Sequence, residues 1–509
     1  MNDEQYGYNE SRSVFFIGKD TLKLGGNENQ ILKPQVYKLN FNITSKRSSK
    51  SYFTDNFLIN KQIRSDEFNI DDLYLNAVKT IQNNNALYVS NQLGLTHKID
   101  ASNAIKFTHQ ISYNGFDQLF IRKGSAQLNQ LYKANRIVTI ANMQWLRMVH
   151  ESNRFNLNFE AAYHKYYLDS SIQEQQIFHN SDSYDILELS PSFSQNFKIG
   201  KTEFNPVYKL SYYKLYRSAE QSQSKFGFKV GLKTKLETNK SNSFLLFLNY
   251  NKKPLVKDRL FNFILLKDYR QSEKYISRLF FQNAFKINGQ YHFTNSYPII
   301  HFRVGFQLEL NKGFLFPETS INQTETFTKY SYKPDWQHSI YYFLYFDKLL
   351  SRLKSTITFK ADLFSTKNYL TTNQIKQWAE NKSVSLSFNF ATAFKSRFNF
   401  LNLLKYQYLF NDDFKTHIIN DKLKVFYSIN KCRFVIEQNT QFLDKSNHLF
   451  ITNFNFIYNI KKQYEVTFKI NNLFNNKFYK TIYLNDNNWN LMSYKLLPRM
   501  WLIGFTLNY

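Results

Sequence analysis

The sequence is poor in the residues that cross-link a fold or bend its backbone. It contains one cysteine, Cys432, with 14 glycines and 8 prolines in 509 residues. A single thiol excludes an intrachain disulfide and a zinc site built from cysteines. Glycine and proline fall well below their average usage of about 7% and 5%. Turns must therefore rely on asparagine and aspartate, which tolerate left-handed backbone, and clusters such as 83–85 and 485–488 fit that role.

Long apolar runs are also missing. No stretch approaches the ~20 apolar residues that a membrane-spanning helix needs, and segment 73–81 is the nearest case of helical spacing. The first six residues are acidic and no apolar core follows them, which excludes a signal peptide at this position. Aromatic residues make up 18% of the chain, yet its mean hydropathy is −0.50. Large apolar side chains must therefore alternate with polar ones.

The formal charge is +27. Basic residues are spread along the whole chain instead of forming an arm or stripe, so nucleic acid is not predicted as a partner. We interpret the charge as dispersed over the surface and a lumen. An anionic ligand or the phosphates of lipopolysaccharide are the alternatives.

A period of two residues recurs throughout and is the strongest signal. Segment 225–236 sets one apolar face, formed by Phe226, Phe228, Val230, Leu232 and Leu236, against Lys225, Lys229, Lys233 and Lys235. Segment 300–310 alternates in the same way, from Ile300 to Leu310. Such segments are β-strands with one apolar and one polar face.

Strand length separates a membrane barrel from a soluble sandwich. Many of these segments run about 9–11 residues, which is the length of a tilted strand that crosses a bilayer. A closed barrel satisfies every backbone group in lipid. At roughly 20–25 residues for a strand and its connections, the sequence predicts an all-β, antiparallel transmembrane barrel of about 22 strands, with long extracellular loops and short periplasmic turns. The lumen of such a barrel is too wide for side chains to fill.

The end of the chain resembles TonB-dependent outer-membrane receptors. Segment 466–479, VTFKINNLFNNKFY, leads a penultimate strand into Asn472, Leu473 and Phe474 and then into the aromatic Phe478. The family shows an Asn-Leu pair and a later aromatic at this spacing, so the resemblance makes these four residues its motif.

The second match is segment 496–509, LLPRMWLIGFTLNY. Pro498 and Arg499 open the last strand without the glycine that the family has between them. The alternation then ends on a terminal aromatic. In the family this end is read by the barrel-assembly machinery, which makes the expected signal Trp501, Ile503, Phe505, Leu507 and Tyr509. The last strand is expected to close the barrel by pairing with the first.

The resemblance implies a multi-pass protein of the cell outer membrane that binds a scarce nutrient and imports it. The nutrient could be a siderophore, haem, a cobalamin, an oligosaccharide or a peptide. We expect residues 1–509 to be the barrel domain, with 1–35 a linker or an early hairpin, and find no plug, TonB box or signal peptide in it. A plug upstream would contact the TonB energising complex. Expected partners are membrane lipid, lipopolysaccharide, the assembly machinery and a surface lipoprotein.

Two other functions remain open: a passive outer-membrane channel without a plug, and a surface scaffold or adhesin. No enzyme motif, cofactor site or metal site is predicted. Segment 200–202 reads as a turn and not a phosphate loop, because Gln195 stands where the first glycine belongs. His97 and His109 are expected on neighbouring strands as solvated residues. Segment 486–489 should lie in the last long connection, as a solvated turn or a ligand contact; other ligand-binding residues are unknown.

Overall fold

The computed structural model is all-β, as predicted. It describes the whole chain except residues 1–4, 18–19, 47, 73–75, 124–127, 151–152, 174–176, 218–219, 256–259, 261–263, 268–269, 298, 412–413, 444–446, 462–463, 485–487 and 508–509. Within the described part, no helix is long and apolar enough to pass through a membrane.

The described residues form 26 strands. The first thirteen are β1 (Gln5–Ile17), β2 (Asp20–Lys46), β3 (Ser51–Asp72), β4 (Asn76–Lys98), β5 (Asn103–Lys123), β6 (Leu128–His150), β7 (Asn153–Gln173), β8 (Ile177–Ile199), β9 (Thr202–Arg217), β10 (Glu220–Glu237), β11 (Asn242–Pro254), β12 (Ile264–Leu266) and β13 (Gln271–Lys274). The others are β14 (Phe281–Ser296), β15 (Ile299–Ile321), β16 (Thr326–Leu350), β17 (Ser355–Thr372), β18 (Ile375–Thr392), β19 (Phe398–Phe410), β20 (Lys415–Ile429), β21 (Cys432–Leu443), β22 (Asn447–Lys461), β23 (Tyr464–Asn471), β24 (Phe478–Leu484), β25 (Asn488–Lys495) and β26 (Met500–Leu507).

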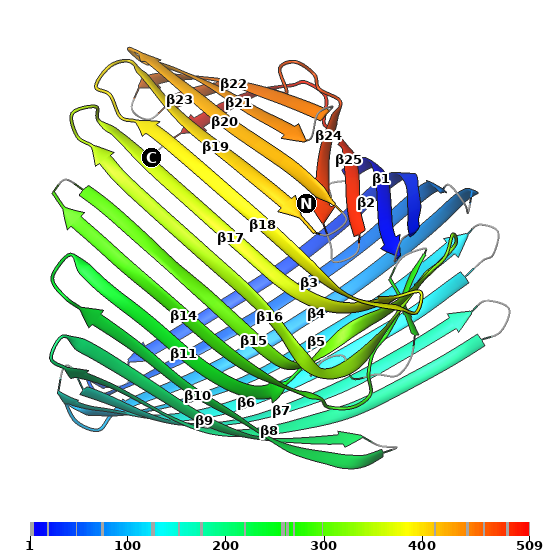
Figure 1. The fold of residues 1–509 in the computed structure, drawn as a ribbon, viewed down its shortest axis with the longest axis vertical. Coiled ribbons are helices and arrows are strands. Elements are labelled where there is room, and N and C mark those ends of the chain that lie inside the picture. Colours follow the sequence, from blue (N-terminus) through cyan, green and yellow to red (C-terminus); the bar gives the residue numbers. More distant parts are fainter. Residues whose placement is uncertain are drawn as a thin grey trace.

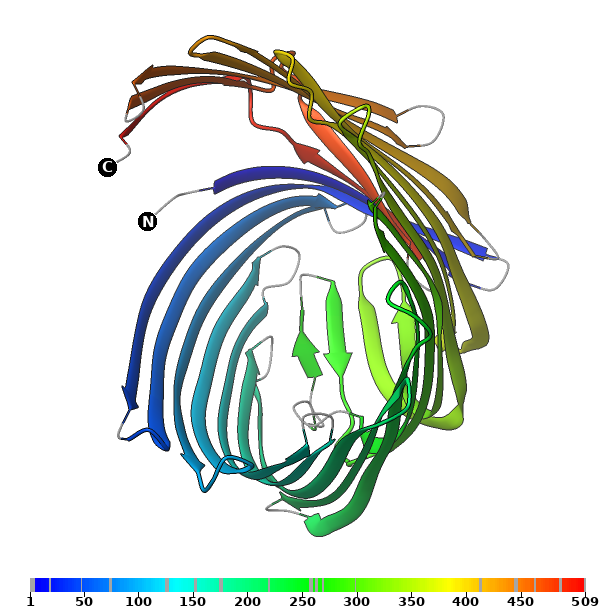
Figure 2. The ribbon, with the colours of Figure 1, turned by 90° about the vertical axis from the view of Figure 1, so that its left-hand side faces the viewer.

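Consecutive strands pair antiparallel and curl into a barrel wall around a bore (Figures 1 and 2). β11 pairs directly with β14, so β12 and β13 lie outside this row. The number of strands exceeds the predicted 22 because two hairpins are added: β12–β13, between β11 and β14, and β24–β25, between β23 and β26.

The wall has two rims. We call the rim that carries residues 48–50, 99–102 and 351–354 the turn end, and the opposite rim, with 322–325 and 373–374, the loop end. Strands such as β3, with 22 residues, are about twice the length that crosses a bilayer. The strands therefore continue beyond the membrane as long hairpins. The sequence predicts long loops at these places.

Asparagine and aspartate shape several turns, but the predicted turn at 83–85 is wrong: these residues lie inside β4, where their backbone pairs with residues 63–65 of β3. Of the predicted turn at 485–488, only Asn488 is described, and it opens β25. Asn373, Asn430, Asn472 and Asn475 adopt positive φ values between 48° and 55°. At the turn end, Asp100 accepts hydrogen bonds from the side chain of Asn103 and the backbone of Ser102, and these bonds lower the pKa of its carboxyl group. Local side-chain bonds of this kind replace the missing glycines.

The alternation separates an apolar outer face from a polar lumen. Phe228 and Val230 on β10 are exposed on the outer face, at 39% and 45% of their surface. Lys225 on the same strand points inward, where its Nζ donates to the carbonyl of Leu279 at 3.0 Å. Exposed apolar side chains on β5–β11 and β14–β16 cluster towards the turn end, as for Phe306 on β15. This half of the wall matches a lipid-facing belt.

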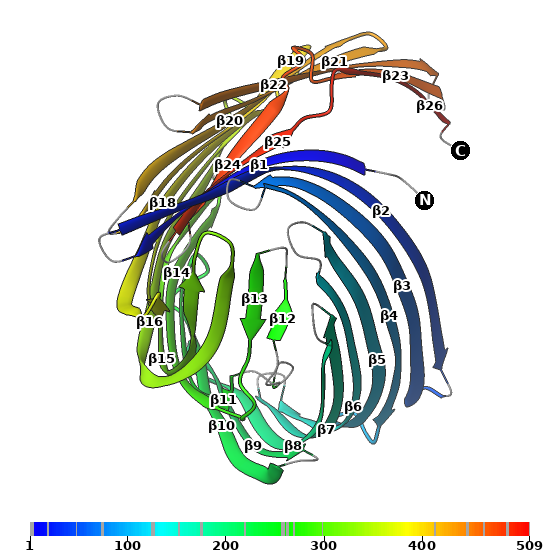
Figure 3. The same ribbon diagram turned by 90° about the vertical axis from the view of Figure 1, so that its right-hand side faces the viewer.

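The predicted closure by the first and last strands is wrong. β26 pairs with β23, with Ile503 opposite Phe468, whereas β1 pairs with β25, with Ser11 opposite Met492. Residues between β23 and β26 form the β24–β25 hairpin, which takes the position beside β1. Figure 3 shows β25 next to β1, with β26 on a separate part of the wall.

Candidate functional site

A segment of the chain folds into the bore. Pro254 at the end of β11 and Phe281 at the start of β14 are direct partners across the ladder, so residues 255–280 are not needed to connect the two strands. Figures 2 and 3 show β12 and β13, which belong to this segment, inside the ring of wall strands.

These two strands join the loop-end halves of β15 and β16. β12 pairs with β13, and β13 runs parallel to β16, with Glu273 opposite Thr328. β15 in turn contacts β17, with Glu318 opposite Thr371. We call β12, β13 and residues 314–333 of β15 and β16 the internal sheet.

A glycine bulge marks the point where β15 leaves the regular ladder. The register between β15 and β16 shifts between Lys312 and Phe314, and Gly313 in between has a φ of +79°. A side chain there would collide with the hydroxyl of Tyr332. Bulges bend the strand that carries them and turn its side chains, so the β15–β16 end departs from the wall here.

One side of the internal sheet, together with the residues that flank β12 and β13, is bonded to β6, β8 and β9. The backbone N–H of Leu266 donates to Gln130 Oε1 at 3.0 Å, and that of Leu260 donates to the Tyr184 hydroxyl at 3.2 Å. Arg217 Nη1 donates to the carbonyl of Ser277 at 2.7 Å.

Arg217 is held in a charge-compensated position. Its side chain is only 5% exposed, and its Nη2 lies 2.9 Å from Asp182 Oδ2 and also donates to the carbonyl of Leu260. Its guanidinium lies 5.7 Å from the centre of the Tyr184 ring. Buried charges persist only where such partners compensate for lost hydration.

Apolar packing reinforces these bonds. Leu260 and Leu279 are 0% and 1% exposed. They belong to the main buried cluster of the described chain, which joins wall strands β7–β9 to the internal segment: Tyr166, Leu168, Tyr184, Ile186, Tyr213, Leu215, Leu260, Leu265, Tyr275 and Leu279. Full burial of each leucine contributes about 1.5–3 kcal/mol. The main buried cluster of the described residues thus lies between the wall and the segment inside the bore.

The other side of the internal sheet is bonded to β17 and β18. Asn373, in the turn between these strands, accepts from the N–H of Ile321 at 2.7 Å and donates to its carbonyl at 2.9 Å. Phe316 packs edge-on against Tyr369, with ring centres 5.0 Å apart, and Phe314 packs against Trp378 at 6.1 Å. The internal sheet therefore spans the bore between two parts of the wall.

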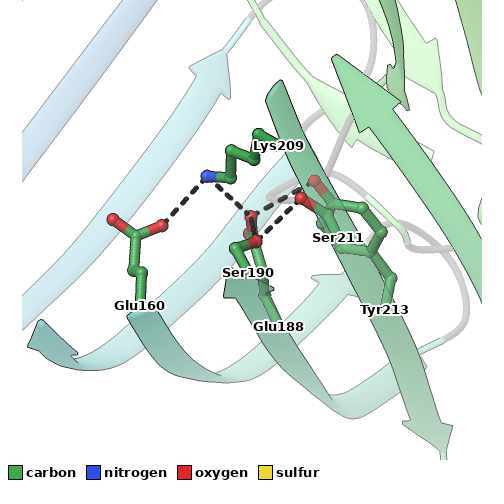
Figure 4. A network of polar contacts seen from close by, with 6 residues as sticks. All are labelled: Glu160, Glu188, Ser190, Lys209, Ser211 and Tyr213. Carbon is green, nitrogen blue, oxygen red and sulfur yellow. Dashed lines mark hydrogen bonds and ion pairs between the residues drawn. The ribbon is translucent and has the colours of Figure 1, made fainter. Parts of the chain in front are cut away.

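A second group, on β7–β9, is a network of polar side chains (Figure 4). Lys209 Nζ donates to Glu160 Oε1 at 3.2 Å and lies 3.8 Å from Glu188 Oε1. Glu188 also accepts from the Tyr213 hydroxyl at 3.2 Å and from Ser190 at 3.1 Å.

Glu188 is 6% exposed, so its charge depends on these partners. The hydroxyls of Ser190 and Ser211 share a hydrogen bond of 2.7 Å and extend the network. Such an arrangement fixes the side chains and gives the wall a rigid polar lining. In the described residues, no group of three or more histidine, cysteine or acidic side chains could hold a metal ion.

The residues of the expected C-terminal signal lie on β26 and beyond it. Trp501, Ile503 and Phe505 are exposed at 59%, 81% and 64%. Leu507 pairs with Tyr464 through its backbone, and Tyr509 lies outside the described residues. The three described side chains share an exposed face, and their reading by an assembly machinery stays a prediction.

Of the penultimate-strand motif, Asn472 is the buried residue. Its Nδ2 donates to the carbonyls of Asn476 at 2.8 Å and Leu497 at 3.0 Å. These bonds connect the end of β23 to the segment before β26. Phe474 and Phe478 are exposed, and the N–H of Leu473 donates to β22.

The remaining sequence candidates lie apart from the bore contacts described above. Residues 200–201 form the turn between β8 and β9. His97 and His109 lie on β4 and β5 but face Ile105 and Leu93, respectively. Of segment 486–489, residues 488–489 open β25, and 486–487 lie outside the described part.

Sequence reasoning missed the internal sheet. Two signals could have indicated it: the loss of alternation over 255–280, and a glycine at position 313 inside a strand pattern.

No family model and no curated protein matches the sequence. Solved structures match its fold. The receptor FpvA of Pseudomonas aeruginosa, in a complex with a heterologous pyoverdine and iron, matches with a TM-score of 0.53 at 9% identity, over 97% of this chain and 72% of that one. The copper transporter OprC matches with a TM-score of 0.47 at 9% identity, over 97% of this chain and 83% of that one.

The described wall, with its apolar belt and polar lumen, defines a large transmembrane-type β-barrel. More closely, the chain has the fold of the outer-membrane receptor barrels, as the C-terminal resemblance implied. At 9% identity this likeness concerns the fold.

Proposed function

We propose that the chain is a transport barrel of the cell outer membrane, and more specifically the barrel of a TonB-dependent receptor for a scarce nutrient. The observation that carries the proposal is the fold shared with FpvA over 97% of the chain. The C-terminal motif and the two-faced wall support it. The nutrient class stays open among siderophores, haem, cobalamins, oligosaccharides and peptides. The protein is proposed to act in transport and not as an enzyme.

The proposed partners follow from this role. Lipid and lipopolysaccharide would contact the apolar belt, and the assembly machinery would read β26. The TonB energising complex would act through a plug that is not among the described elements. A surface lipoprotein could cover the loop end.

A passive channel is the second candidate. It is favoured by the internal sheet, because a barrel that narrows its own bore needs no separate plug to limit what passes. Deleting the gene in its own host distinguishes the two. For a receptor, we expect the deletion to abolish uptake of one scarce nutrient, and a protonophore should abolish the same uptake in the parent strain. Loss of small-solute permeation that a protonophore does not affect would instead support the channel.

A further inference from the structure

Residues 255–280 have no role in joining β11 to β14, because Pro254 and Phe281 are already paired. The segment nevertheless contributes Leu260, Leu265 and Leu279 to the main buried cluster. This connection is longer than the wall requires, and buried contacts hold it in place. It therefore restricts the space inside the bore.

The position of the internal sheet is fixed from two sides. Gln130 bonds β12 to β6, and Tyr184 and Arg217 bond the flanking residues Leu260 and Ser277 to β8 and β9. On the other side, Asn373 bonds Ile321 to the β17–β18 turn. Figure 3 shows β12 and β13 inside the ring of wall strands, so a solute that crosses the barrel has to pass beside them.

The segment is also cationic. Its described residues include four cations, Lys267, Arg270, Lys274 and Arg278, and one acid, Glu273, which lies 3.4 Å from Lys267. A passage whose lining has a net positive charge raises the local concentration of anions. Lys225 on the adjoining wall, bonded to the Leu279 carbonyl, adds to this field.

We infer that the internal sheet is a resident constriction of the bore, which limits conduction and favours small anions over cations. A constriction acts in the same way in a receptor and in a channel, so a negative result here leaves the proposed transport role intact.

Replacing residues 255–280 by Asn-Gly tests the constriction directly. A two-residue turn of this type joins paired antiparallel strands, and Pro254 and Phe281 supply such a pair. The full chain and the variant are refolded in detergent and inserted into planar bilayers. We expect the variant to conduct several-fold more than the full chain and to lose anion preference in a salt gradient. Lys233→Gln, on the lumen face of β10, is the control and should keep the parent conductance.

A second measurement does not depend on the deletion folding. In a Cys432→Ser background, Gln271→Cys places a thiol on β13, and Lys233→Cys places one on the wall; both native residues are exposed. A bulky neutral thiol reagent should reduce the current strongly at position 271 and little at position 233. Equal effects at the two positions, or a deletion variant that folds and conducts like the parent, would overturn the constriction.

Discussion

Arg217 on β9 donates a hydrogen bond of 2.7 Å to the backbone carbonyl of Ser277. The two residues are 60 positions apart, and their bond connects the wall to the internal segment. Because Arg217 is also paired with Asp182 at 2.9 Å, one side chain couples an ion pair of the wall to the position of the internal sheet.

Arg217→Gln should release the internal segment. Losing one partner of a buried ion pair costs about 3–5 kcal/mol. The substitution also removes the bonds from Arg217 to the carbonyls of Leu260 and Ser277, so these residues should be held less firmly. Limited trypsin digestion of the folded barrel should cut within this segment much faster than in the parent. Lys233→Gln should leave the rate unchanged. Equal rates for parent and Arg217→Gln would show that the apolar contacts alone hold the segment.

Gly313→Ala should disturb the inward turn of β15. The position has a φ of +79° and no room for a side chain next to Tyr332. A left-handed conformation costs a residue with a side chain about 1–2 kcal/mol, and the collision adds to this. We expect a lower unfolding midpoint in urea. Gly200→Ala, at a turn with a φ of +57° and open space around it, isolates the conformational cost and should lower the midpoint less.

Lys209 and Glu188 should be energetically coupled. Lys209→Met leaves the buried Glu188 without its cation. Because the side chain of Lys209 is 31% exposed, the loss should be smaller than the cost of breaking a fully buried pair, which is about 3–5 kcal/mol. Glu188→Gln in the same chain should recover part of the loss. The free energies of unfolding of the two single variants and the double variant measure the coupling. Additive losses would mean that the 3.8 Å approach contributes nothing.

Val230→Arg should destabilise the barrel in lipid. Val230 is exposed on the outer belt, and a cationic side chain at mid-membrane depth costs about 2–4 kcal/mol. Lys229→Arg, on the lumen face next to it, should be nearly neutral. Unfolding in lipid vesicles measures both. Similar losses at the two positions would contradict the assignment of the outer face.

The C-terminal residue should matter for assembly more than for stability. Deleting Tyr509 removes one aromatic side chain, yet we expect outer-membrane insertion of an exported form to fall steeply. Tyr509→Phe should preserve insertion, and Thr506→Ala on β26 is the control. Heat-modifiability of outer-membrane fractions measures folding. If the deletion inserts like the control, β26 is an ordinary strand and not an assembly signal.

The two faces of the wall could be predicted from the sequence, because the alternation that creates them is a local pattern. Alternation along segment 225–236 sets which side chains face outward, and the structure confirms it at Phe228 and Val230. Asparagine turns depend on local bonds too, but composition did not locate them: the cluster 83–85 lies within β4 and pairs with β3 instead of turning.

The polar network on β7–β9 could not be predicted from a local pattern. Glu160, Glu188 and Lys209 lie on three strands, and only the register of β7, β8 and β9 brings them together. The C-terminal strand shows the same limit: its alternation was recognisable, but its pairing with β23 instead of β1 depends on where the β24–β25 hairpin packs.

By itself, the sequence determined that this protein is a two-faced antiparallel barrel, because a period of two places every apolar side chain on one face whatever the partner strand. The tertiary structure decided what occupies the bore. The bond between Gln130 and Leu266 spans 136 positions, and Gly313 turns β15 towards it through a bulge. Contacts at such separations are selected by packing and hydrogen bonding in the folded barrel, and no local pattern specifies them.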